Sequence, residues 1–250
     1  MGKAEKNKFR FGLIGRNISY SFSRGYFTEK FSNLHLEHHS YENFDLEEIN
    51  EFKEIVRKSE NIKGLNVTIP YKEEIIPYLN ELDSQAEKIG AVNTIKLSPE
   101  GLIGFNTDAY GFRKSLEPNL KRHHKKALIL GTGGASKAIA FVLDELGIDF
   151  SFVSRNPSKN QLSYADLTVN ILEENLLIIN STPLGTHPEV EKKPAIPYEY
   201  IGSKHLLFDL IYNPEKTAFL LEGELRHATI CNGLRMLELQ AEKAWEIWNS

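Results

Sequence analysis

Short apolar runs and amphipathic segments alternate along this chain of 250 residues. The clearest example begins at Ala127–Leu130, a run of apolar residues that fits a strand covered on both faces. Gly131, Gly133 and Gly134 follow, and glycines allow a tight turn and a close approach of the backbone to a ligand. Apolar residues then recur at helical spacing, at Ile139, Val142, Leu143 and Leu146. The pattern predicts a strand, a glycine turn and a helix.

The part of the chain before this unit shows the same alternation on a smaller scale. Predicted strands cover residues 8–14, 34–41, 62–69, 91–97 and 102–108. The last two form a hairpin around the Pro/Gly turn at 98–101, which would bring Asn93 close to Asn106–Asp108. Leu46, Ile49 and Phe52 share one helical face, with Asp45 as a plausible N-cap. Alternating strands and helices favour a mostly parallel sheet.

Beyond the glycine turn the pattern continues to the end of the sequence. Further strands are predicted at 149–154, 177–180, 205–210 and 229–231, and helices at 217–226 and 233–248. The crossover from Asn156 to Leu176 is polar and predicts a stub helix at most. The final helix has one apolar face, which must be buried, and the simplest partner is the first domain. We therefore predict an α/β protein of two domains, residues 1–107 with 233–250 and residues 108–232.

The glycine turn and the following strand favour a dinucleotide. A helix that opens on unpaired N–H groups after glycines can bind a pyrophosphate. Ser136 occupies the third position of the G-x-G-x-x-G pattern, so a βα turn without a ligand is the alternative. The next strand ends at Ser154-Arg155-Asn156 without a carboxylate. A guanidinium suits a 2′-phosphate, which favours NADP over NAD, although exposed arginines at strand ends are also common.

Polar residues in the first domain offer candidates for a small-molecule site. Ser21 and Ser23 alternate on an extended loop, so their hydroxyls can meet one polyol, although loop serines are common. Thr68 ends a strand and Lys72 follows Pro70 into the next helix, where a solvated lysine is the simpler interpretation. As a bare aspartate, Asp108 would cap the helix at 109–116.

Composition narrows the class of protein. The net charge of −4 and the pI near 6.1 give no indication of a basic surface that would bind nucleic acid. A single cysteine, Cys231, excludes an internal disulfide and fits a reducing compartment. No apolar run reaches membrane-spanning length, and no His or Cys cluster has metal-ligand spacing. We expect a cytoplasmic protein without a metal, as a monomer or homodimer.

The order of these motifs resembles the shikimate dehydrogenase family over nearly the whole chain. The motifs are the Ser21/Ser23 loop, Asn66-Val-Thr-Ile-Pro-Tyr-Lys72, Ala91-Val-Asn-Thr94, Asn106-Thr-Asp108, Gly131-Thr-Gly-Gly-Ala-Ser136, Asn180-Ser-Thr182 and the segment from Gly233 through Met236 to Gln240. The family's own glycine motif has this form, with serine in the third position. Two departures flank the serines, where family members usually have histidine and proline and this chain has Tyr20 and Arg24.

The resemblance implies an N-terminal substrate domain, a Rossmann-like NADP domain, and NADP-dependent reduction of 3-dehydroshikimate to shikimate in aromatic amino-acid biosynthesis. It implies Lys72 and Asp108 as the catalytic pair. It also implies that the substrate is held by Ser21, Ser23, Thr68, Asn93, Tyr212 and Gln240. The residues that would border the cofactor are Gly131, Gly133, Gly134, Ala135, Arg155, Thr182, Gly233 and Met236.

Two other functions stay open at this point. One is a quinate/shikimate dehydrogenase with relaxed cofactor use. The other is a sensor that keeps the fold and binds a shikimate-like acid without turnover. A sensor does not need Lys72 and Asp108 together, so their presence favours the enzyme.

Overall fold

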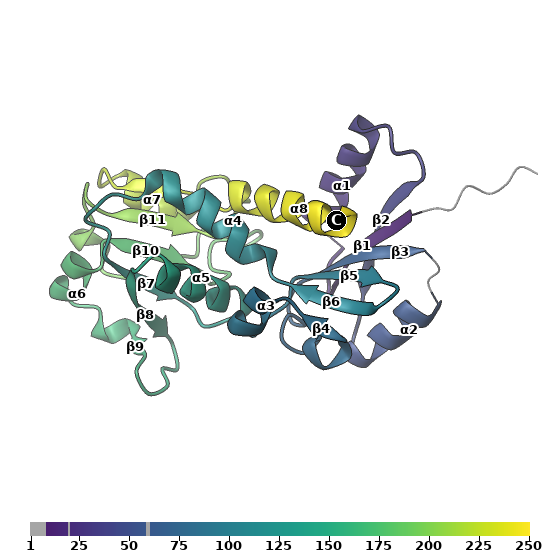
Figure 1. The fold of residues 1–250 in the computed structure, drawn as a ribbon. Helices are drawn as coiled ribbons and strands as arrows, with labels where there is room; N and C mark the ends of the chain where they lie inside the picture. The colour runs from purple at the N-terminus through teal and green to yellow at the C-terminus, as the bar shows by residue number, and fades with distance from the viewer. Residues whose placement is uncertain (1–8, 20, 59–60) are drawn as a thin grey trace, which may run out of the picture. The chain divides into compact units, whose positions relative to one another are not determined.

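The structure, a computed structural model, describes residues 9–19, 21–58 and 61–250 (Figure 1). The chain divides into two compact units. Unit 1 comprises Met1–Thr107 and Ala241–Ser250, and unit 2 comprises Asp108–Gln240. Each unit is built on its own six-stranded sheet, so the α/β fold class predicted from the sequence is confirmed.

The sheet of unit 1 is mostly parallel, as predicted, with three parallel and two antiparallel pairs of neighbouring strands. Its strands, in spatial order, are β2 (His39–Asp45), β1 (Phe9–Gly15), β3 (Ile62–Val67), β5 (Thr94–Ser98), β6 (Gly101–Phe105) and β4 (Glu81–Leu82). β1 runs parallel to both of its neighbours, whereas β5 is antiparallel to β3 and to β6. The antiparallel pair β5–β6 is the predicted hairpin. Such a hairpin needs only a short turn, while parallel neighbours need a crossover.

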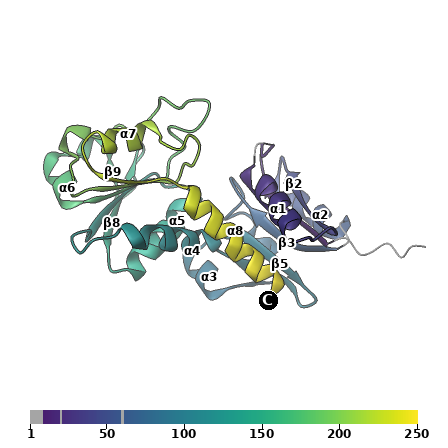
Figure 2. The ribbon, with the colours of Figure 1, turned by 90° about the horizontal axis from the view of Figure 1, so that it is seen from above.

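The helices of unit 1 are α1 (Phe22–Asn33), α2 (Phe52–Lys58), α3 (Ser84–Ile89) and the C-terminal part of α8 (Leu234–Asn249), with 3-10 turns at Ile49–Glu51 and Ile76–Tyr78. Figures 1 and 2 show α1 beside the end of α8. Aromatic rings fill the space between these helices and the sheet, and Trp248 packs against Phe11 and Phe27 with ring centroids 5.0 and 5.3 Å away. The final helix therefore returns to the first domain as predicted, but only with residues 241–250, since the helix up to Gln240 belongs to unit 2.

Three predictions for unit 1 were wrong. The strand expected at 34–41 is β2, at His39–Asp45, because α1 continues to Asn33 and a turn follows in which His35 has a φ of 55°. Asp45 ends β2 and caps no helix; the next element is a 3-10 turn. Lys72 does not begin a helix, since residues 71–75 form consecutive turns.

Unit 2 has the strand order of a dinucleotide-binding sheet. Its strands, in spatial order, are β9 (Leu162–Ser163), β8 (Asp149–Ser154), β7 (Lys126–Leu130), β10 (Leu177–Asn180), β11 (Leu206–Asp209) and β12 (Thr229–Cys231). All neighbouring pairs are parallel. In order of sequence this arrangement is 3-2-1-4-5-6, in which the direction of winding reverses between β7 and β10. Ligands of such sheets bind beyond the carboxyl ends of the strands at this reversal.

The helices of unit 2 are α4 (Thr107–Leu116), α5 (Gly134–Glu145), α6 (Val169–Glu174), α7 (Ala218–Glu224) and the first part of α8, with 3-10 turns at Glu117–Asn119, Tyr164–Asp166 and Tyr198–Tyr200. α6 is the short helix expected in the polar crossover, whereas β9 was missed. The strand expected at 149–154 and the helix that follows the glycine turn are both present.

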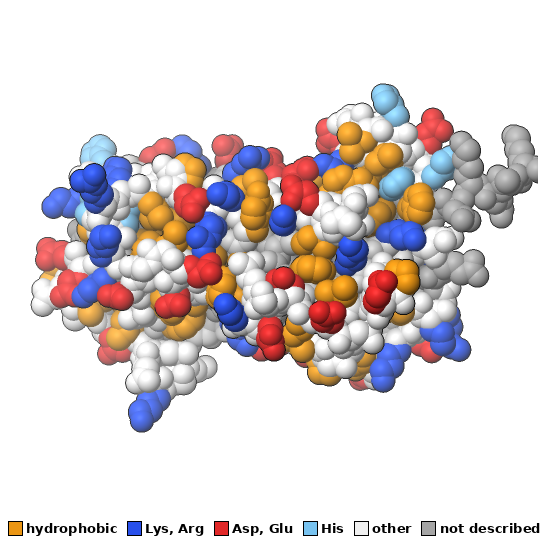
Figure 3. All heavy atoms as spheres, in the orientation of Figure 1, with side chains coloured by type: hydrophobic (Ala, Val, Ile, Leu, Met, Phe, Trp, Pro, Cys, Tyr) orange, Lys and Arg blue, Asp and Glu red, His pale blue; other side chains and the backbone are white. Residues whose placement is uncertain are grey.

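The surface mixes both signs of charge. On the face shown in Figure 3, lysine and arginine side chains are interspersed with aspartate and glutamate on each unit. Among the described residues, no helix combines the length and the apolar character needed to cross a bilayer.

Candidate functional site

The serine loop of unit 1 is held by the end of β2. Ser21 is the N-cap of α1, and its hydroxyl accepts a hydrogen bond from the backbone N–H of Ser23 at 3.2 Å. The Asp45 carboxylate accepts the backbone N–H groups of Asn17 at 2.7 Å and Ile18 at 3.3 Å. Asp45 is thus an anchor of the loop that carries both predicted substrate serines. Tyr20, which departs from the family pattern, lies outside the described residues.

A partly buried chain of hydrogen bonds links Ser23 to the strands of the sheet. The Ser23 and Tyr41 hydroxyls are hydrogen-bonded, and Tyr41 also donates to Asn66 Oδ1 at 2.8 Å. Burial raises the pKa of Tyr41, so its hydroxyl stays protonated and can donate. Asn66 in turn donates to the carbonyl of Asn93 and to Thr94 Oγ1, at 3.3 and 3.2 Å.

Asn93 is the last residue of this hydrogen-bond chain. Its side-chain Oδ1 accepts bonds from the Thr107 backbone N–H at 2.7 Å and from the hydroxyls of Thr94 and Thr107, both at 3.1 Å. Because Oδ1 is occupied by these donors, the orientation of the Asn93 amide is fixed, with the NH₂ on the opposite side. This confirms the predicted approach of Asn93 to the 106–108 segment. Four predicted or linking positions, Ser23, Tyr41, Asn66 and Asn93, therefore form one connected group.

Thr68 and Lys72 lie just beyond the carboxyl end of β3. Thr68 donates its backbone N–H to Ile14 at the end of β1, at 2.8 Å, and accepts the N–H of Tyr71 at 3.0 Å. The carbonyl of Lys72 accepts the N–H of Val92, next to Asn93, at 2.7 Å. The backbones of β1, β3 and the segment before β5 are thus joined where Thr68, Lys72 and Asn93 lie.

In unit 2, the glycine turn meets the loop after β10. Gly131 has a φ of +105°, and a Cβ at this position would lie 2.9 Å from Ser181 Oγ and 3.1 Å from Thr182 Cγ2. Ser181 is held by the carbonyl of Leu130, which accepts both its N–H and its hydroxyl at 2.9 and 2.7 Å. Gly131 and Thr182 are therefore neighbours at the point where the sheet reverses its winding.

The amino end of α5 has the form of a phosphate cradle. Gly133 is the N-cap, with no side-chain cap bond, and the space where its Cβ would stand is open. Gly134 and Ala135 begin the helix, and Ser136 turns its hydroxyl back onto the carbonyl of Gly133 at 2.6 Å. The first N–H groups of a helix lack the usual partner four residues earlier, and here glycine at the N-cap leaves the space beside them open. This arrangement fits a dinucleotide pyrophosphate.

Arg155 follows directly on β8, the strand beside β7, and its side chain is exposed. It therefore stands at the same edge of the sheet as the glycine turn, at the next strand. This is where a Rossmann-type sheet contacts the adenosine ribose, and a guanidinium there suits a 2′-phosphate.

The remaining predicted residues gather around α4, α8 and the end of β11. A Cβ at Gly233 would lie 2.0 Å from the carbonyl oxygen of Leu210, so only glycine permits this approach of α8 to the segment before Tyr212. Gly111 has the same role in α4, because a Cβ there would lie 2.5 Å from the Met236 carbonyl and 3.3 Å from the Gln240 Cβ. Asp108, one turn before Gly111, is 3% exposed.

The predicted site residues are divided between the two units. Unit 1 holds Ser21, Ser23, Thr68, Lys72 and Asn93, and unit 2 holds Asp108, Gly131, Gly133, Gly134, Ala135, Arg155, Thr182, Tyr212, Gly233, Met236 and Gln240. Lys72 and Asp108, the predicted catalytic pair, belong to different units.

Sequence reasoning missed Tyr41 and Asp45 as supports of the serine loop, together with the buried Asp209 of β11. For Tyr41 and Asp45 the misplacement of β2 hid their alternation on one face of an edge strand. Asp209 could have been found from the sequence, because it is a carboxylate at the end of an otherwise apolar strand.

Comparison with known proteins gives consistent results over the chain. Residues 13–95 match the shikimate dehydrogenase substrate binding domain. The chain is 41% identical to the shikimate dehydrogenase (NADP(+)) of Clostridium botulinum and 38% identical to that of Methanosphaera stadtmanae, covering 95% of this chain in both and 95% and 90% of those proteins. The structure of shikimate 5-dehydrogenase from Thermus thermophilus in complex with NADP(H) and shikimate is 31% identical and superposes with a TM-score of 0.83, covering 96% of this chain and 93% of that chain.

Proposed function

This chain belongs to the shikimate dehydrogenase family, and from that premise we propose that it reversibly reduces 3-dehydroshikimate to shikimate with NADPH. The observation that carries the proposal is the 41% identity, over 95% of this chain, to a relative that is named for this activity. The reaction belongs to the biosynthesis of aromatic amino acids.

Unit 2 is the part that we assign to NADP. Its strand order, the open cradle at Gly133 and the contact of Gly131 with Thr182 support this assignment. Ala135, Gly134, Gly233 and Met236 would border the same ligand, and Arg155 would pair with the 2′-phosphate. When bound, the cofactor supplies the hydride.

Unit 1, with residues of unit 2, is the part that we assign to the substrate. Hydroxyl and amide groups match the hydroxyls and carboxylate of shikimate, because each can donate or accept a hydrogen bond. We assign this contact to Ser21, Ser23, Thr68, Asn93, Tyr212 and Gln240. The partly buried chain from Ser23 through Tyr41 to Asn93 supports the idea that several of these groups are held in place before the substrate binds.

Lys72 and Asp108 are the residues that we assign to proton transfer. Reduction of a ketone places negative charge on its oxygen, and an ammonium group can both stabilise that charge and deliver a proton. In the proposed mechanism Lys72 does so, and Asp108 orients the ammonium. In the oxidation of shikimate, neutral Lys72 takes the proton of the hydroxyl.

We further propose that the enzyme acts in the cytoplasm as a monomer or homodimer, on small molecules rather than on nucleic acid or membranes. The net charge of −4 and the single cysteine support this proposal.

The absorbance of the purified protein at 340 nm with shikimate, and with NADP+ and NAD+ in parallel, tests the function. Reduction of NADP+ alone is the expected result. Comparable rates with both cofactors, or turnover of quinate, would instead identify a broader quinate/shikimate dehydrogenase. Shikimate binding without any reduction would identify the sensor.

A further inference from the structure

A polar network lies buried at the carboxyl ends of β10 and β11 in unit 2. Its members are Asn180, Asp209 and Thr217, and the side chains of all three are fully buried, each at 0% exposure. The Asp209 carboxylate accepts hydrogen bonds from Asn180 Nδ2 at 3.0 Å, the Ile211 backbone N–H at 3.0 Å and the Thr217 hydroxyl at 2.6 Å. Each carboxylate oxygen therefore has a partner.

One side of this network leads to the predicted cofactor loop. With its NH₂ on Asp209, Asn180 turns Oδ1 toward Thr182 and accepts both the backbone N–H at 3.0 Å and the hydroxyl at 2.7 Å. Thr182 Oγ1 also accepts the N–H of Leu184 at 3.3 Å. Asn180 Nδ2 also donates to the carbonyl of Leu184 at 3.4 Å, a longer bond than the one to Asp209. Both acceptors hold the NH₂ on this side, because an amide turned over would present NH₂ to donors.

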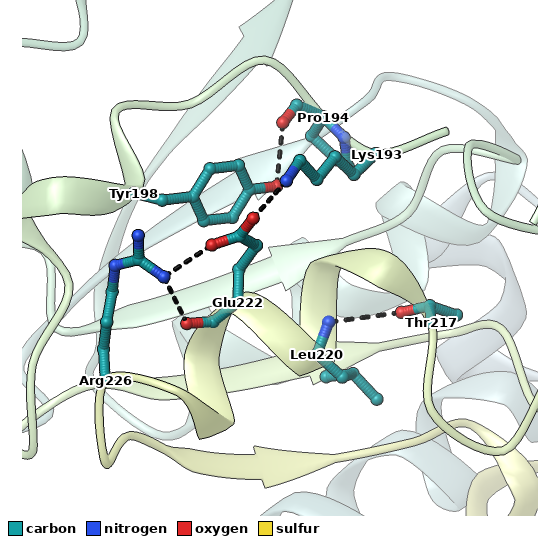
Figure 4. A network of polar contacts seen from close by, with 7 residues as sticks. All are labelled: Lys193, Pro194, Tyr198, Thr217, Leu220, Glu222 and Arg226. Atoms are coloured by element: carbon teal, nitrogen blue, oxygen red, sulfur yellow. Dashed lines mark hydrogen bonds and ion pairs between the residues drawn. The ribbon is translucent and has the colours of Figure 1, made fainter. Parts of the chain in front are cut away.

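On its other side, the network connects Asp209 through Thr217 to α7, away from the residues assigned to the cofactor. Thr217 is the N-cap of α7, where its hydroxyl accepts the N–H of Leu220 at 3.3 Å. Figure 4 shows this cap and also Glu222, which lies on the same helix and contacts Lys193 and Arg226 outside it. The Thr217 branch thus stabilises α7, whereas the Asn180 branch ends at Thr182.

We propose that Asp209 is a positioning residue for the reaction, acting through Asn180 to hold Thr182 against the cofactor and through the Ile211 amide to hold the backbone that leads to Tyr212. This proposal rests on the proposed function, in which Thr182 contacts NADP and Tyr212 contacts the substrate. A carboxylate is well suited to this place because it accepts from three donors and donates to none.

Asp209→Ala, Asn180→Ala and Thr217→Val test the proposal together. Asp209→Ala and Asn180→Ala each remove one end of the bond that orients Thr182, so KM for NADP+ is expected to rise about tenfold, with a smaller fall in kcat. Thr217→Val is the matched control, since it damages the same network and the α7 cap but leaves the bond between Asn180 and Asp209. Its KM is expected to stay near the wild-type value. Asp209→Asn retains an acceptor for Asn180 and Ile211 and is expected to restore KM.

Several outcomes would overturn the proposal. An unchanged KM in Asn180→Ala, which remains informative if Asp209→Ala does not fold, would remove the link to the cofactor. An equal rise of KM in Thr217→Val would show that the network only stabilises the unit.

Hydrogen exchange in the ligand-free protein separates this proposal from the proposed function. If the wild type fails to reduce NADP+, the function is wrong, but the amide protons of Thr182 and Leu184 can still be followed. They are expected to exchange faster in Asn180→Ala than in Thr217→Val. Equal rates in the two variants would contradict the positioning role.

Discussion

At the scale of single residues, Tyr41 shows how a buried hydroxyl can prepare a polar site. It lies on edge strand β2 at 6% exposure and connects Ser23 with Asn66. Tyr41→Phe keeps the ring and its stacking on Phe27 but removes both bonds. We expect KM for shikimate to rise about three- to tenfold, the effect of roughly 1 kcal/mol, with kcat little changed. Steady-state kinetics of the two proteins measures this, and an unchanged KM would mean that Ser23 needs no such support.

The proposed acid–base role of Lys72 is also tested at this scale. Lys72→Ala is expected to lower kcat by about 10²–10⁴, the usual range for a positioned proton donor. Lys88→Ala is the control, because Lys88 is exposed in the last turn of α3, and it should retain wild-type kcat. Turnover of Lys72→Ala at the wild-type rate, measured at 340 nm, would exclude the role.

Asp209 is expected to make stability depend on pH. Burial raises its pKa from 3.8 to about 6, partly offset by its bonds to Thr217, Ile211 and Asn180. Between these two values the carboxyl is protonated in the folded chain but ionised in the unfolded chain. The folded state then binds the extra proton, so this group's contribution to stability falls as pH rises toward 6 and is constant above it.

Asp209→Asn removes this titration. Between pH 5 and pH 7 the free energy of unfolding of the wild type should fall relative to that of the variant by roughly 1.4 kcal/mol, the equivalent of one pKa unit. Urea denaturation at the two pH values measures the difference. Tyr198 interacts electrostatically with both Asp209 and Glu222, and the variant leaves Tyr198 and Glu222 in place. Parallel pH dependence in the two proteins would show that Asp209 does not titrate in this range.

At the scale of elements, the sequence predicted unit 2 better than unit 1. β8 and β10 lie where the apolar runs placed them, and α5 follows the glycine turn as expected. Buried parallel strands read as continuous apolar runs, which makes them conspicuous. β2 is an edge strand with few apolar residues, while Leu34 and Leu36 in the preceding turn imitate strand alternation. The pattern therefore placed the strand several residues too early.

The candidate site was predictable to the extent that its residues stand at the ends of strands. Thr68, Thr182 and Arg155 each follow a strand that was recognised. The residues that support them were harder to predict from the sequence, because hydrogen-bond partners such as Tyr41 and Ser23 are distant in sequence. The pairing of β1 with β2 and β3 brings Tyr41 to Asn66, and α1 brings Ser23 to Tyr41.

Gly64 is an element-scale test of how the end of α8 packs on unit 1. A Cβ at Gly64, in β3, would lie 2.2 Å from the Trp248 indole, whose Nε1–H donates to the carbonyl of Ile95 at 3.0 Å. Gly64→Ala is therefore expected to destabilise the fold by about 1–3 kcal/mol, as overpacked cores do. Gly25→Ala is the matched control, since a Cβ there meets nothing within 4 Å and alanine favours a helix by up to about 1 kcal/mol. Urea denaturation should give changes of opposite sign, and equal stability of the two variants would contradict this packing.

At the scale of the whole molecule, each unit contains its own prearranged polar network. In unit 1 the network runs from Ser23 to Asn93, and in unit 2 it runs from Asp209 to Thr182. The residues named here for each network belong to a single unit. Since the orientation of these groups is fixed locally, we expect each unit to retain its half of the site when only one ligand is bound.

Hydrogen exchange with single ligands tests this independence. NADP+ alone is expected to slow exchange in unit 2, at the amides around Gly131–Ser136 and Thr182, because their N–H groups and loops become covered. Shikimate alone is expected to slow exchange in unit 1, around Ser21–Ser23 and Thr68, together with the few amides of unit 2 near Asp108 and Tyr212. Mass spectrometry of peptides from the two units, at ligand concentrations well above Kd, measures both patterns. If shikimate protected unit 1 only when NADP+ was also present, the substrate half of the site would depend on the cofactor, and the two networks would not be independent.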